Sequence, residues 1–230
     1  MNPLDWLLEG TFVVAGAPIL VREVVGNAFG LGSAWFGLRR SVLAWPVGVV
    51  GNLLLLTVFL GGILDKPQAE DLWGQAGRQV FFVALSVYGW VRWRRSSRDG
   101  EASDGGAIRP GWASGRDRLL MLGLAVLGMV VLTPTLRALD SYGPLSDAWI
   151  LTGSMLATYA MARGWSEFWL VWIAVDAVGV PLLVQAGYYP SAVMYGGYGL
   201  FCAVGFVTWL RVSRTTGGPS ARPRPQEALR

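Results

Sequence analysis

The stretch LLMLGLAVLGMVVLTPTL, residues 119–136, decides the fold class, because it is a long run without a single charged side chain. Arg118 stands directly before it and Arg137 directly after it. A helix needs about 20 mainly apolar residues to cross the hydrocarbon core of a bilayer. This run therefore predicts a membrane-spanning helix with a charged residue at each interface.

The rest of the chain repeats this pattern of apolar runs between short charged stretches. Charged residues make up only 15% of the chain, whereas a soluble domain carries about 25%. The sequence therefore predicts an all-α membrane protein with seven spans. The apolar stretch 7–21 is expected to form either an interfacial helix or the start of a long tilted first span. The other six predicted spans cover residues 23–38, 42–64, 79–91, 147–162, 168–186 and 191–210.

The placement of basic residues predicts how these spans are oriented. If the loop with Arg39 and Arg40 faces the cytoplasm, most of the 19 lysine and arginine residues lie on that side. Cytoplasmic loops of membrane proteins carry such an excess. We therefore expect a multi-pass protein of the bacterial inner membrane, with its N-terminus outside and its C-terminus in the cytoplasm. The basic residues on the outer side or in the first span are Arg22, Lys66, Arg78 and Arg137.

The two ends of the chain form a weak internal repeat. At an offset of 124 residues, and of 116 after a longer loop in the first half, similar residues meet in the same order. Each repeat holds three spans and one span separates them, so both repeats enter the membrane in the same direction. This predicts a 3+1+3 arrangement of two parallel repeats, with SWEET-like pseudo-symmetry and a substrate site between them. The matching pairs are Glu23–Asp147, Trp35–Tyr159, Arg39–Arg163, Trp45–Trp169, Asn52–Asp176, Gln79–Tyr195, Gly89–Gly205 and Trp93–Trp209.

This repeat divides the chain into six predicted regions. Gly, Ser, Asp and Arg dominate the linker between the repeats, which indicates a flexible cytoplasmic segment. The Pro- and Arg-rich end indicates a disordered tail. The regions are an extracellular or interfacial segment 1–22, a first repeat 23–95, a cytoplasmic linker 96–118, a linker helix 119–137, a second repeat 147–212 and a cytoplasmic tail 213–230.

Composition excludes several kinds of site. The chain has no histidine and one cysteine, Cys202, so zinc sites of the usual kind and His-dependent nucleophiles are excluded. Lys66 is the sole lysine and lies outside any phosphate-binding loop motif. We expect no enzyme, no cofactor, no metal and no nucleic-acid partner. The expected partners are a small-molecule substrate and the lipid bilayer, and a homo-oligomer stays open.

Ionisable groups inside spans indicate function by default. Asp176 lies mid-span and is expected to bind substrate, with a structural hydrogen bond as the alternative. Trp169 and Trp172 lie on the same predicted helix face as Asp176, where two aromatic planes and a carboxylate would suit a flat heterocycle with polar edges. Structural hydrogen bonding or surface anchoring remains the alternative for the other candidates. These are Trp45 and Asn52 as repeat mates, with Gln79, Tyr88, Trp90, Tyr195 and Tyr198.

Three short motifs resemble the PnuC family of vitamin transporters. They are WPVG at 45–48, YGWVRW at 88–93 and WLVW at 169–172, and the resemblance covers nearly all of residues 20–212. The resemblance implies seven spans in a three-one-three order. It also implies facilitated diffusion of a vitamin precursor, which a cytoplasmic kinase then traps. An intramembrane enzyme and a membrane subunit that carries nothing are the alternatives from other classes.

The second half looks most like the riboflavin branch of that family, the RibM branch. ARGWSEFW at 162–169 and VDAVGVPL at 175–182 carry this similarity. The resemblance implies that riboflavin is the substrate, with Asp176 accepting hydrogen bonds from its hydroxyls or its ring imide. Nicotinamide riboside is the alternative, because it is a cation and a carboxylate beside tryptophans suits a cation.

Overall fold

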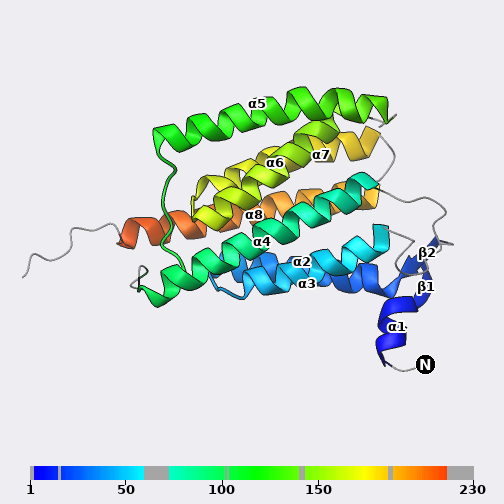
Figure 1. Ribbon diagram of the computed structural model, residues 1–230, viewed down its shortest axis with the longest axis horizontal. Coiled ribbons are helices and arrows are strands. Elements are labelled where there is room, and N and C mark those ends of the chain that lie inside the picture. Colours follow the sequence, from blue (N-terminus) through cyan, green and yellow to red (C-terminus); the bar gives the residue numbers. More distant parts are fainter. Residues whose placement is uncertain are drawn as a thin grey trace, which may run out of the picture.

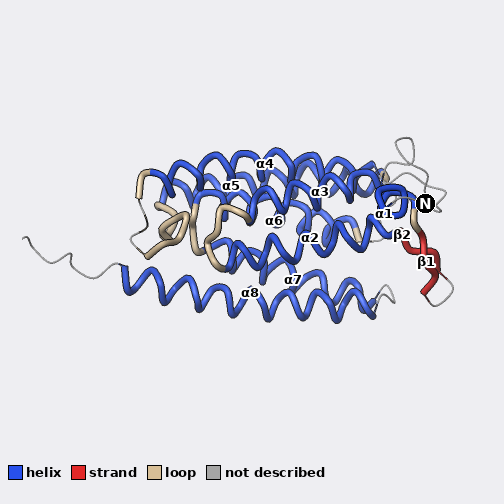
Figure 2. Tube along the Cα trace, turned by 90° about the horizontal axis from the view of Figure 1, so that it is seen from below, coloured by secondary structure: helices blue, strands red, loops and turns tan. Residues whose placement is uncertain are grey.

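The computed structural model describes residues 3–14, 17–59, 73–100, 102, 104–139, 143–185 and 189–216. Within these residues the chain forms eight helices and one two-stranded sheet, and the seven longer helices run side by side as one elongated bundle (Figures 1 and 2). The elements are α1 Pro3–Glu9, β1 Thr11–Val14, β2 Ala17–Leu20, α2 Val21–Leu38, α3 Ala44–Phe59, α4 Trp73–Arg98, α5 Gly115–Ala138, α6 Pro144–Arg163, α7 Glu167–Gln185 and α8 Tyr189–Thr216.

Each predicted span corresponds to one of the helices α2 to α8, and the main differences lie at the ends. Helix α4 extends past the predicted span at both ends, to Trp73 and to Arg98, because a helix backbone continues where apolar residues stop. Helix α5 begins four residues before its apolar run, where the Ser114 hydroxyl accepts a bond of 3.1 Å from the Asp117 amide. Residues 60–64 and 217–230, parts of the predicted second span and tail, lie outside the described residues.

Helix packing follows the order of the chain in both halves. Helix α3 packs between α2 and α4, and α7 packs between α6 and α8, while α4 also contacts α6. Helix α5 contacts α6 and lies along the edge of the bundle (Figure 1). Among the described residues, α5 is the one helix that is long and apolar enough to cross a membrane when only length and composition are considered. Ala44–Val58 is a shorter apolar helix.

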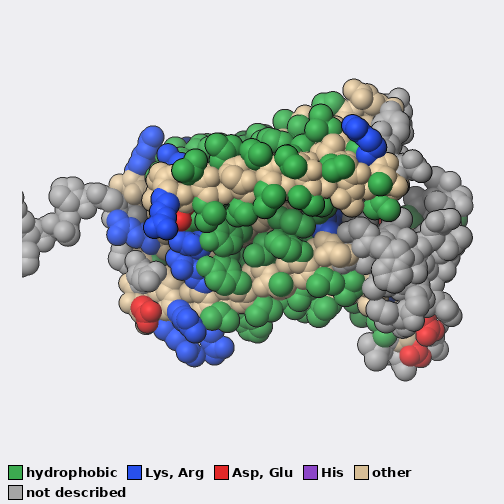
Figure 3. Space-filling view, turned by 45° about the horizontal axis from the view of Figure 1, so that its top comes forward, with side chains coloured by type: hydrophobic (Ala, Val, Ile, Leu, Met, Phe, Trp, Pro, Cys, Tyr) green, Lys and Arg blue, Asp and Glu red, His purple; other side chains and the backbone are tan. Residues whose placement is uncertain are grey.

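Charge and apolar surface are separated along the bundle. Figure 3 shows hydrophobic side chains over the middle of one face, with most of the visible lysine and arginine side chains at one end. We call this the arginine-rich end; it holds the ends of α2, α4 and α6 with Arg40, Arg95 and Arg163. Helix α5 has no buried residue. Its outward Leu and Val side chains are therefore available to lipid.

The N-terminal segment differs from both expected forms. Helix α1 ends at Glu9, and the chain then forms an antiparallel hairpin in which Thr11 pairs with Leu20. The Val21 amide donates to the Gly10 carbonyl over 2.8 Å, which joins the hairpin to α2. Valine, isoleucine and threonine favour strands, so this apolar stretch is neither a continuous interfacial helix nor the start of α2. The predicted all-α fold therefore gains one small sheet.

The linker before α5 is fixed to both halves of the bundle. The Ala107 amide donates to the Arg40 carbonyl over 2.8 Å, and the Gly111 amide donates to the Gly164 carbonyl over 3.0 Å. Arg40 and Gly164 are related by the repeat offset of 124, and both have a positive φ, of 52° and 76°. Gly164 is suited to this conformation, whereas Arg40 bears its steric cost.

Side chains complete these contacts at both corners. Arg40 and Asp104 form a two-bond ion pair, with nitrogen–oxygen distances of 3.0 and 2.6 Å. Glu167 accepts bonds from the Ala113 amide at 3.0 Å and from Arg118 Nη2 at 2.8 Å. We call these contacts the linker clasp. The hydrogen bond from Arg40 holds the pKa of the Asp104 carboxyl below its usual range.

The linker clasp holds residues 104–118 in a segment where composition alone predicts flexibility. Composition predicted flexibility because Gly, Ser and Asp dominate residues 96–118. Ala107, Ile108 and Ala113 are nevertheless buried. The carbonyls that hold the linker belong to the turns after α2 and α6, and carbonyls have no signature in the sequence.

Candidate substrate cavity

A cavity of about 420 Å³ lies between α2, α3, α4, α6, α7 and α8. Its wall mixes aromatic rings with polar groups, as in sites that bind small molecules. The aromatic lining residues are Trp45, Phe82, Phe168, Trp169, Trp172, Tyr195, Tyr198 and Phe201. The other polar or charged lining residues are Asn27, Ser33, Asn52, Arg78, Ser86, Ser154, Thr158 and Asp176.

The structure brings seven of the ten predicted site residues together on this wall. Two of them lie on α3 and five lie on α7 and α8. Only the packing of the first half of the chain against the second brings them to one wall. The seven are Trp45, Asn52, Trp169, Trp172, Asp176, Tyr195 and Tyr198.

Gln79, Tyr88 and Trp90 do not line the cavity. Gln79 is buried, and its Oε1 has no hydrogen-bond partner in the described part of the chain. Trp90 is 37% exposed. Gln79 lies three and seven residues before Phe82 and Ser86, on nearly the same side of α4, so the helix period alone does not exclude it from the wall.

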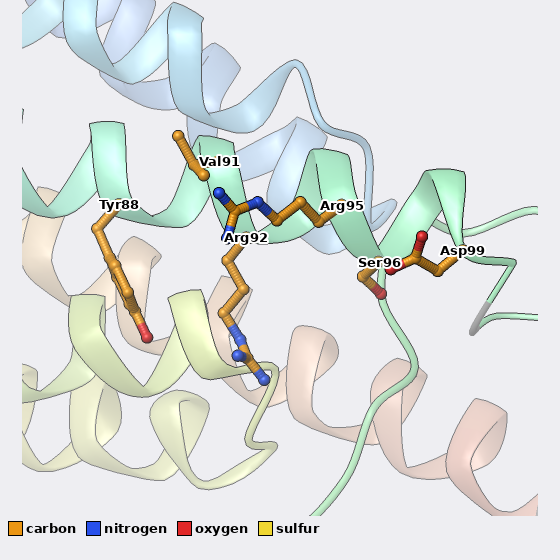
Figure 4. A pocket seen from close by; sticks show the side chains of 6 residues that line it. All are labelled: Tyr88, Val91, Arg92, Arg95, Ser96 and Asp99. Carbon is orange, nitrogen blue, oxygen red and sulfur yellow. The ribbon is translucent and has the colours of Figure 1, made fainter.

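Tyr88 lines a different pocket, of about 370 Å³, near the arginine-rich end of α4. Its ring stacks on Tyr159 with centroids 6.2 Å apart. Figure 4 shows the side chains of Tyr88 and Arg92 pointing the same way, towards α6. This part of α4 thus contributes a tyrosine pair that packs α4 against α6.

The cavity wall follows the sequence repeat closely. Seven pairs of residues related by an offset of 124 or 116 both line it. Equivalent helix faces of the two halves therefore meet at one space. The pairs are Gly30–Ser154, Ala34–Thr158, Trp45–Trp169, Gly48–Trp172, Asn52–Asp176, Phe82–Tyr198 and Ser86–Cys202.

Trp45 and Trp169 are packed in the same way in the two halves. A Cβ added to Gly89 would lie 2.5 Å from the Trp45 ring, and one added to Gly205 would lie 2.5 Å from the Trp169 ring. Both residues are 3% exposed. The Nε1 atoms of both indoles have no hydrogen-bond partner within the described residues. A buried N–H without a partner is costly, so each indole is suited to donate to a ligand.

A second pair of tryptophans lies beneath this one, towards the arginine-rich end. Trp93 contacts Trp45 edge to face, with centroids 5.2 Å apart, and Trp209 contacts Trp169 likewise at 6.1 Å. Trp93 donates to the Met161 carbonyl over 3.3 Å. Trp209 donates to the Leu38 carbonyl over 3.2 Å. Each half is therefore bonded to the other half below the cavity.

Trp169 and Trp172 have different surroundings, although both were expected to stack on a substrate. The Trp169 ring packs against Phe168, with centroids 4.3 Å apart, and against Phe201 at 5.9 Å. Trp172, one turn further on, is only partly buried and lines the cavity. Trp172 is thus the ring that a flat ligand can cover, whereas Trp169 offers its N–H.

Asp176 supplies the acceptor on this wall. Its side chain is mostly buried, and its Oδ2 has no hydrogen-bond partner in the described residues. Gly199 leaves the carboxylate uncrowded, since a Cβ there would lie 3.6 Å from it. A buried acceptor without a donor is expensive, which favours a bond to a ligand.

Sequence reasoning missed Arg78 and most of the hydroxyl lining. Arg78 was counted on the outer side because the predicted span began at Gln79, whereas α4 begins at Trp73. Arg78 therefore lies inside the helix and on the cavity wall. The repeat offset offered no signal for Ser154 and Thr158, because their mates Gly30 and Ala34 have no polar side chain.

Comparison with known proteins places this fold and cavity. The family model described as nicotinamide mononucleotide transporter matches residues 20–211. The riboflavin/roseoflavin transporter RibM of Streptomyces davaonensis is 34% identical, over 96% of this chain and 100% of that protein. The nicotinamide riboside transporter PnuC of Escherichia coli is 24% identical, over 85% of this chain and 87% of that protein.

A solved structure shares the fold. The crystal structure of the vitamin B3 transporter PnuC matches with a TM-score of 0.64 and 20% identity, covering 84% of this chain and 82% of that one. The resemblance to vitamin transporters and the expectation of a multi-pass membrane protein are thus confirmed. The chain belongs to the nicotinamide mononucleotide transporter family, a family of membrane transporters that includes PnuC and RibM proteins.

Proposed function

We propose that this protein imports riboflavin by facilitated diffusion and that cytoplasmic phosphorylation then traps the vitamin. The observation that carries the proposal is the full-length similarity to a riboflavin/roseoflavin transporter, at 34% identity. The cavity volume of about 420 Å³ falls within the roughly 300–1000 Å³ typical of small-molecule sites. The chain is thus a carrier and not an enzyme.

The architecture that we propose is 3+1+3, with α2–α4 and α6–α8 as parallel repeats and α5 as the linking helix. The seven pairs of equivalent lining residues support it. The arginine-rich end is the cytoplasmic end in this proposal, following the positive-inside rule, which puts the N-terminus outside. Alternating access then moves one repeat against the other around the cavity.

The proposed ligand contacts use the groups that lack partners. Trp172 stacks on the ring system, and Asp176 accepts from the ring imide or the ribityl hydroxyls. The indoles of Trp45 and Trp169 donate hydrogen bonds to the substrate, because their Nε1 atoms have no partner within the described residues. Asn52, Tyr195 and Tyr198 add further polar contacts from the wall.

A nicotinamide riboside carrier is the second candidate. Two observations favour it: the 24% identity to PnuC proteins and the carboxylate of Asp176 on a wall that holds Trp172. Carboxylates and aromatic faces both attract cations.

Flavin fluorescence distinguishes the two candidates. Riboflavin is titrated with the purified protein, and nicotinamide riboside is then added as competitor. We expect strong quenching that excess nicotinamide riboside does not reverse. Absence of quenching, together with thermal stabilisation by nicotinamide riboside, would refute riboflavin as the substrate. In liposomes without an energy source, riboflavin should equilibrate across the bilayer, whereas accumulation against a gradient would exclude facilitated diffusion.

A further inference from the structure

Arg78 is a cationic side chain on the cavity wall that the proposed contacts do not use. It lies near the start of α4, at the end of the bundle opposite the arginine-rich end. Its Nε is buried and has no hydrogen-bond partner in the described part of the chain. Its guanidinium carbon lies 6.0 Å from the ring centroid of Phe82, which also lines the cavity.

The position of Arg78 does not suit an arginine that only sets topology. Such arginines lie in water or at the membrane interface, as Arg137 does on the exposed surface of the last turn of α5. Arg78 instead interacts electrostatically with Tyr195 and with Asp147 in the first turn of α6. A cation kept within a helical bundle is costly, and its retention points to a role in the pathway.

Arg78 and Asp176 provide opposite charges at different depths of one cavity. Asp176 lies seven residues beyond Trp169, or roughly 10 Å along α7. Arg78 lies eleven residues before Gly89, which contacts Trp45, or roughly 16 Å along α4. Because Trp45 and Trp169 are equivalent, the Cα atom of Arg78 lies on the order of 6 Å further along the bundle from the tryptophans than the Cα atom of Asp176.

A donor and an acceptor on the wall of one cavity can together complement an amide or imide edge. The carboxylate accepts from an N–H, and the guanidinium donates to a carbonyl oxygen. The ring imide of a flavin and the carboxamide of nicotinamide both present such an edge. Hydrogen bonding alone therefore separates the two vitamins poorly, whereas charge separates them well, because the nicotinamide ring of the riboside is a cation and the flavin ring is neutral.

We propose that Arg78 is the residue that makes this cavity prefer an uncharged ring with carbonyl acceptors over a positively charged ring. The inference rests on the proposed riboflavin function and adds its specificity. The guanidinium donates to a flavin carbonyl and repels a pyridinium at the same place.

Selectivity is tested by measuring the Kd of riboflavin and of nicotinamide riboside for the wild type, Arg78→Gln and Arg78→Lys. In Arg78→Gln the preference for riboflavin should fall roughly ten- to a hundredfold, the range for one charge-assisted bond. Arg78→Lys keeps the charge and should keep most of the discrimination against the cation. Arg137→Gln removes an exposed arginine and should leave both Kd values unchanged.

The outcomes separate this inference from the proposed function. A wild type that binds only nicotinamide riboside overturns both. A wild type that binds riboflavin, together with an Arg78→Gln variant in which both Kd values rise by the same factor or not at all, overturns the inference alone. Such a result would give Arg78 a structural role.

A measurement on the wild type keeps the inference testable if both variants fail to fold. Nicotinamide riboside and its reduced dihydro form have nearly the same shape, but only the oxidised form carries a positive charge. Competition against riboflavin should be at least several-fold stronger for the reduced, neutral form. Equal competition by the two forms, or stronger competition by the cation, would overturn charge discrimination at the cavity.

Discussion

The two halves of the cavity wall occupy equivalent positions but present different chemistry. The second half places Ser154, Thr158 and Trp172 where the first half has Gly30, Ala34 and Gly48. The larger and more polar side chains thus lie on α6 and α7, while α2 and α3 leave space. This difference indicates that the repeat builds the shape of the cavity and that the second half supplies most of the recognition.

The tryptophan packing beneath the cavity, in contrast to the cavity wall, is nearly the same in both halves. Trp45 and Trp169 each lie against a glycine of the third helix, and each contacts a second tryptophan edge to face. The two halves therefore differ more at the cavity wall than in the tryptophan packing beneath it. Substitutions in equivalent positions should reveal where the halves are equal and where they differ.

The largest expected effect is on stability and concerns the two tryptophans that are packed in the same way in both halves. Trp45→Ala and Trp169→Ala should each reduce stability by about 3–5 kcal/mol, because each removes a buried indole that its glycine neighbour was shaped to accept. Thermal unfolding of the purified protein measures this, with Trp90→Ala, at an exposed position, as control. A large effect in one half and a small one in the other would contradict equivalent packing.

Filling the open half should have the next largest effect. A Cβ added to Gly30 meets nothing within 4 Å, and Gly30 lines the cavity, so Gly30→Phe places a ring in the substrate space. Riboflavin binding should weaken by about a hundredfold, or about 2.7 kcal/mol, with the melting temperature unchanged. Gly123 on α5 is equally open, and Gly123→Phe is the matched control. Full binding by Gly30→Phe would mean that the substrate does not use the first half.

The sequence allowed the helices and much of the wall to be predicted, because both depend on periodic patterns. Apolar runs located α2 to α8, and the repeat offset paired Trp45 with Trp169 and Asn52 with Asp176. The hairpin before α2 was missed, since a short run of branched apolar residues looks the same in a strand and at a span's edge. Arg78 was missed because the predicted apolar span began one residue after it, at Gln79.

Other features depend on partners that sequence patterns do not reveal. The linker clasp uses the backbone carbonyls of Arg40 and Gly164, which any residue would provide. The i, i+3 spacing placed Trp169 and Trp172 on one face, but only tertiary packing covers one ring with Phe168 and leaves the other at the cavity.

Removing the ring that belongs to the second half alone should have a moderate effect. Trp172→Ala should weaken riboflavin binding by roughly 1–1.5 kcal/mol, or about 5- to 12-fold, from lost stacking. Fluorescence titration measures it, with the exposed Leu170 on the same helix changed to Ala as control. Unchanged affinity would disprove stacking on Trp172.

Asp176→Asn makes the second half resemble the first, where Asn52 occupies the equivalent position. A charge-assisted hydrogen bond becomes a neutral one, so riboflavin affinity should fall by about 1 kcal/mol, or roughly fivefold. Uptake and its pH profile are measured in the same liposomes. If both stay unchanged, the charge of Asp176 has no part in binding, and the difference between the halves lies in Trp172.

The smallest effect is expected where the linker clasp joins the two halves. The pKa of Asp104 is lowered in the folded protein by its hydrogen bond from Arg40. A carboxyl with a lowered pKa contributes stability above its unfolded pKa of about 3.9, and this contribution is lost as the pH falls through the folded pKa.

Because Asp104 is partly exposed, solvent screening keeps the contribution below about 1 kcal/mol. Asp104→Asn should therefore lower the melting temperature slightly and evenly from pH 5 to 8, with the difference shrinking below about pH 4 and vanishing only below the lowered pKa of the folded state. Asp99→Asn, at the exposed end of α4, controls for the change in net charge. An equal difference at every pH would mean that the Asp104 side chain acts by its shape and not by its charge.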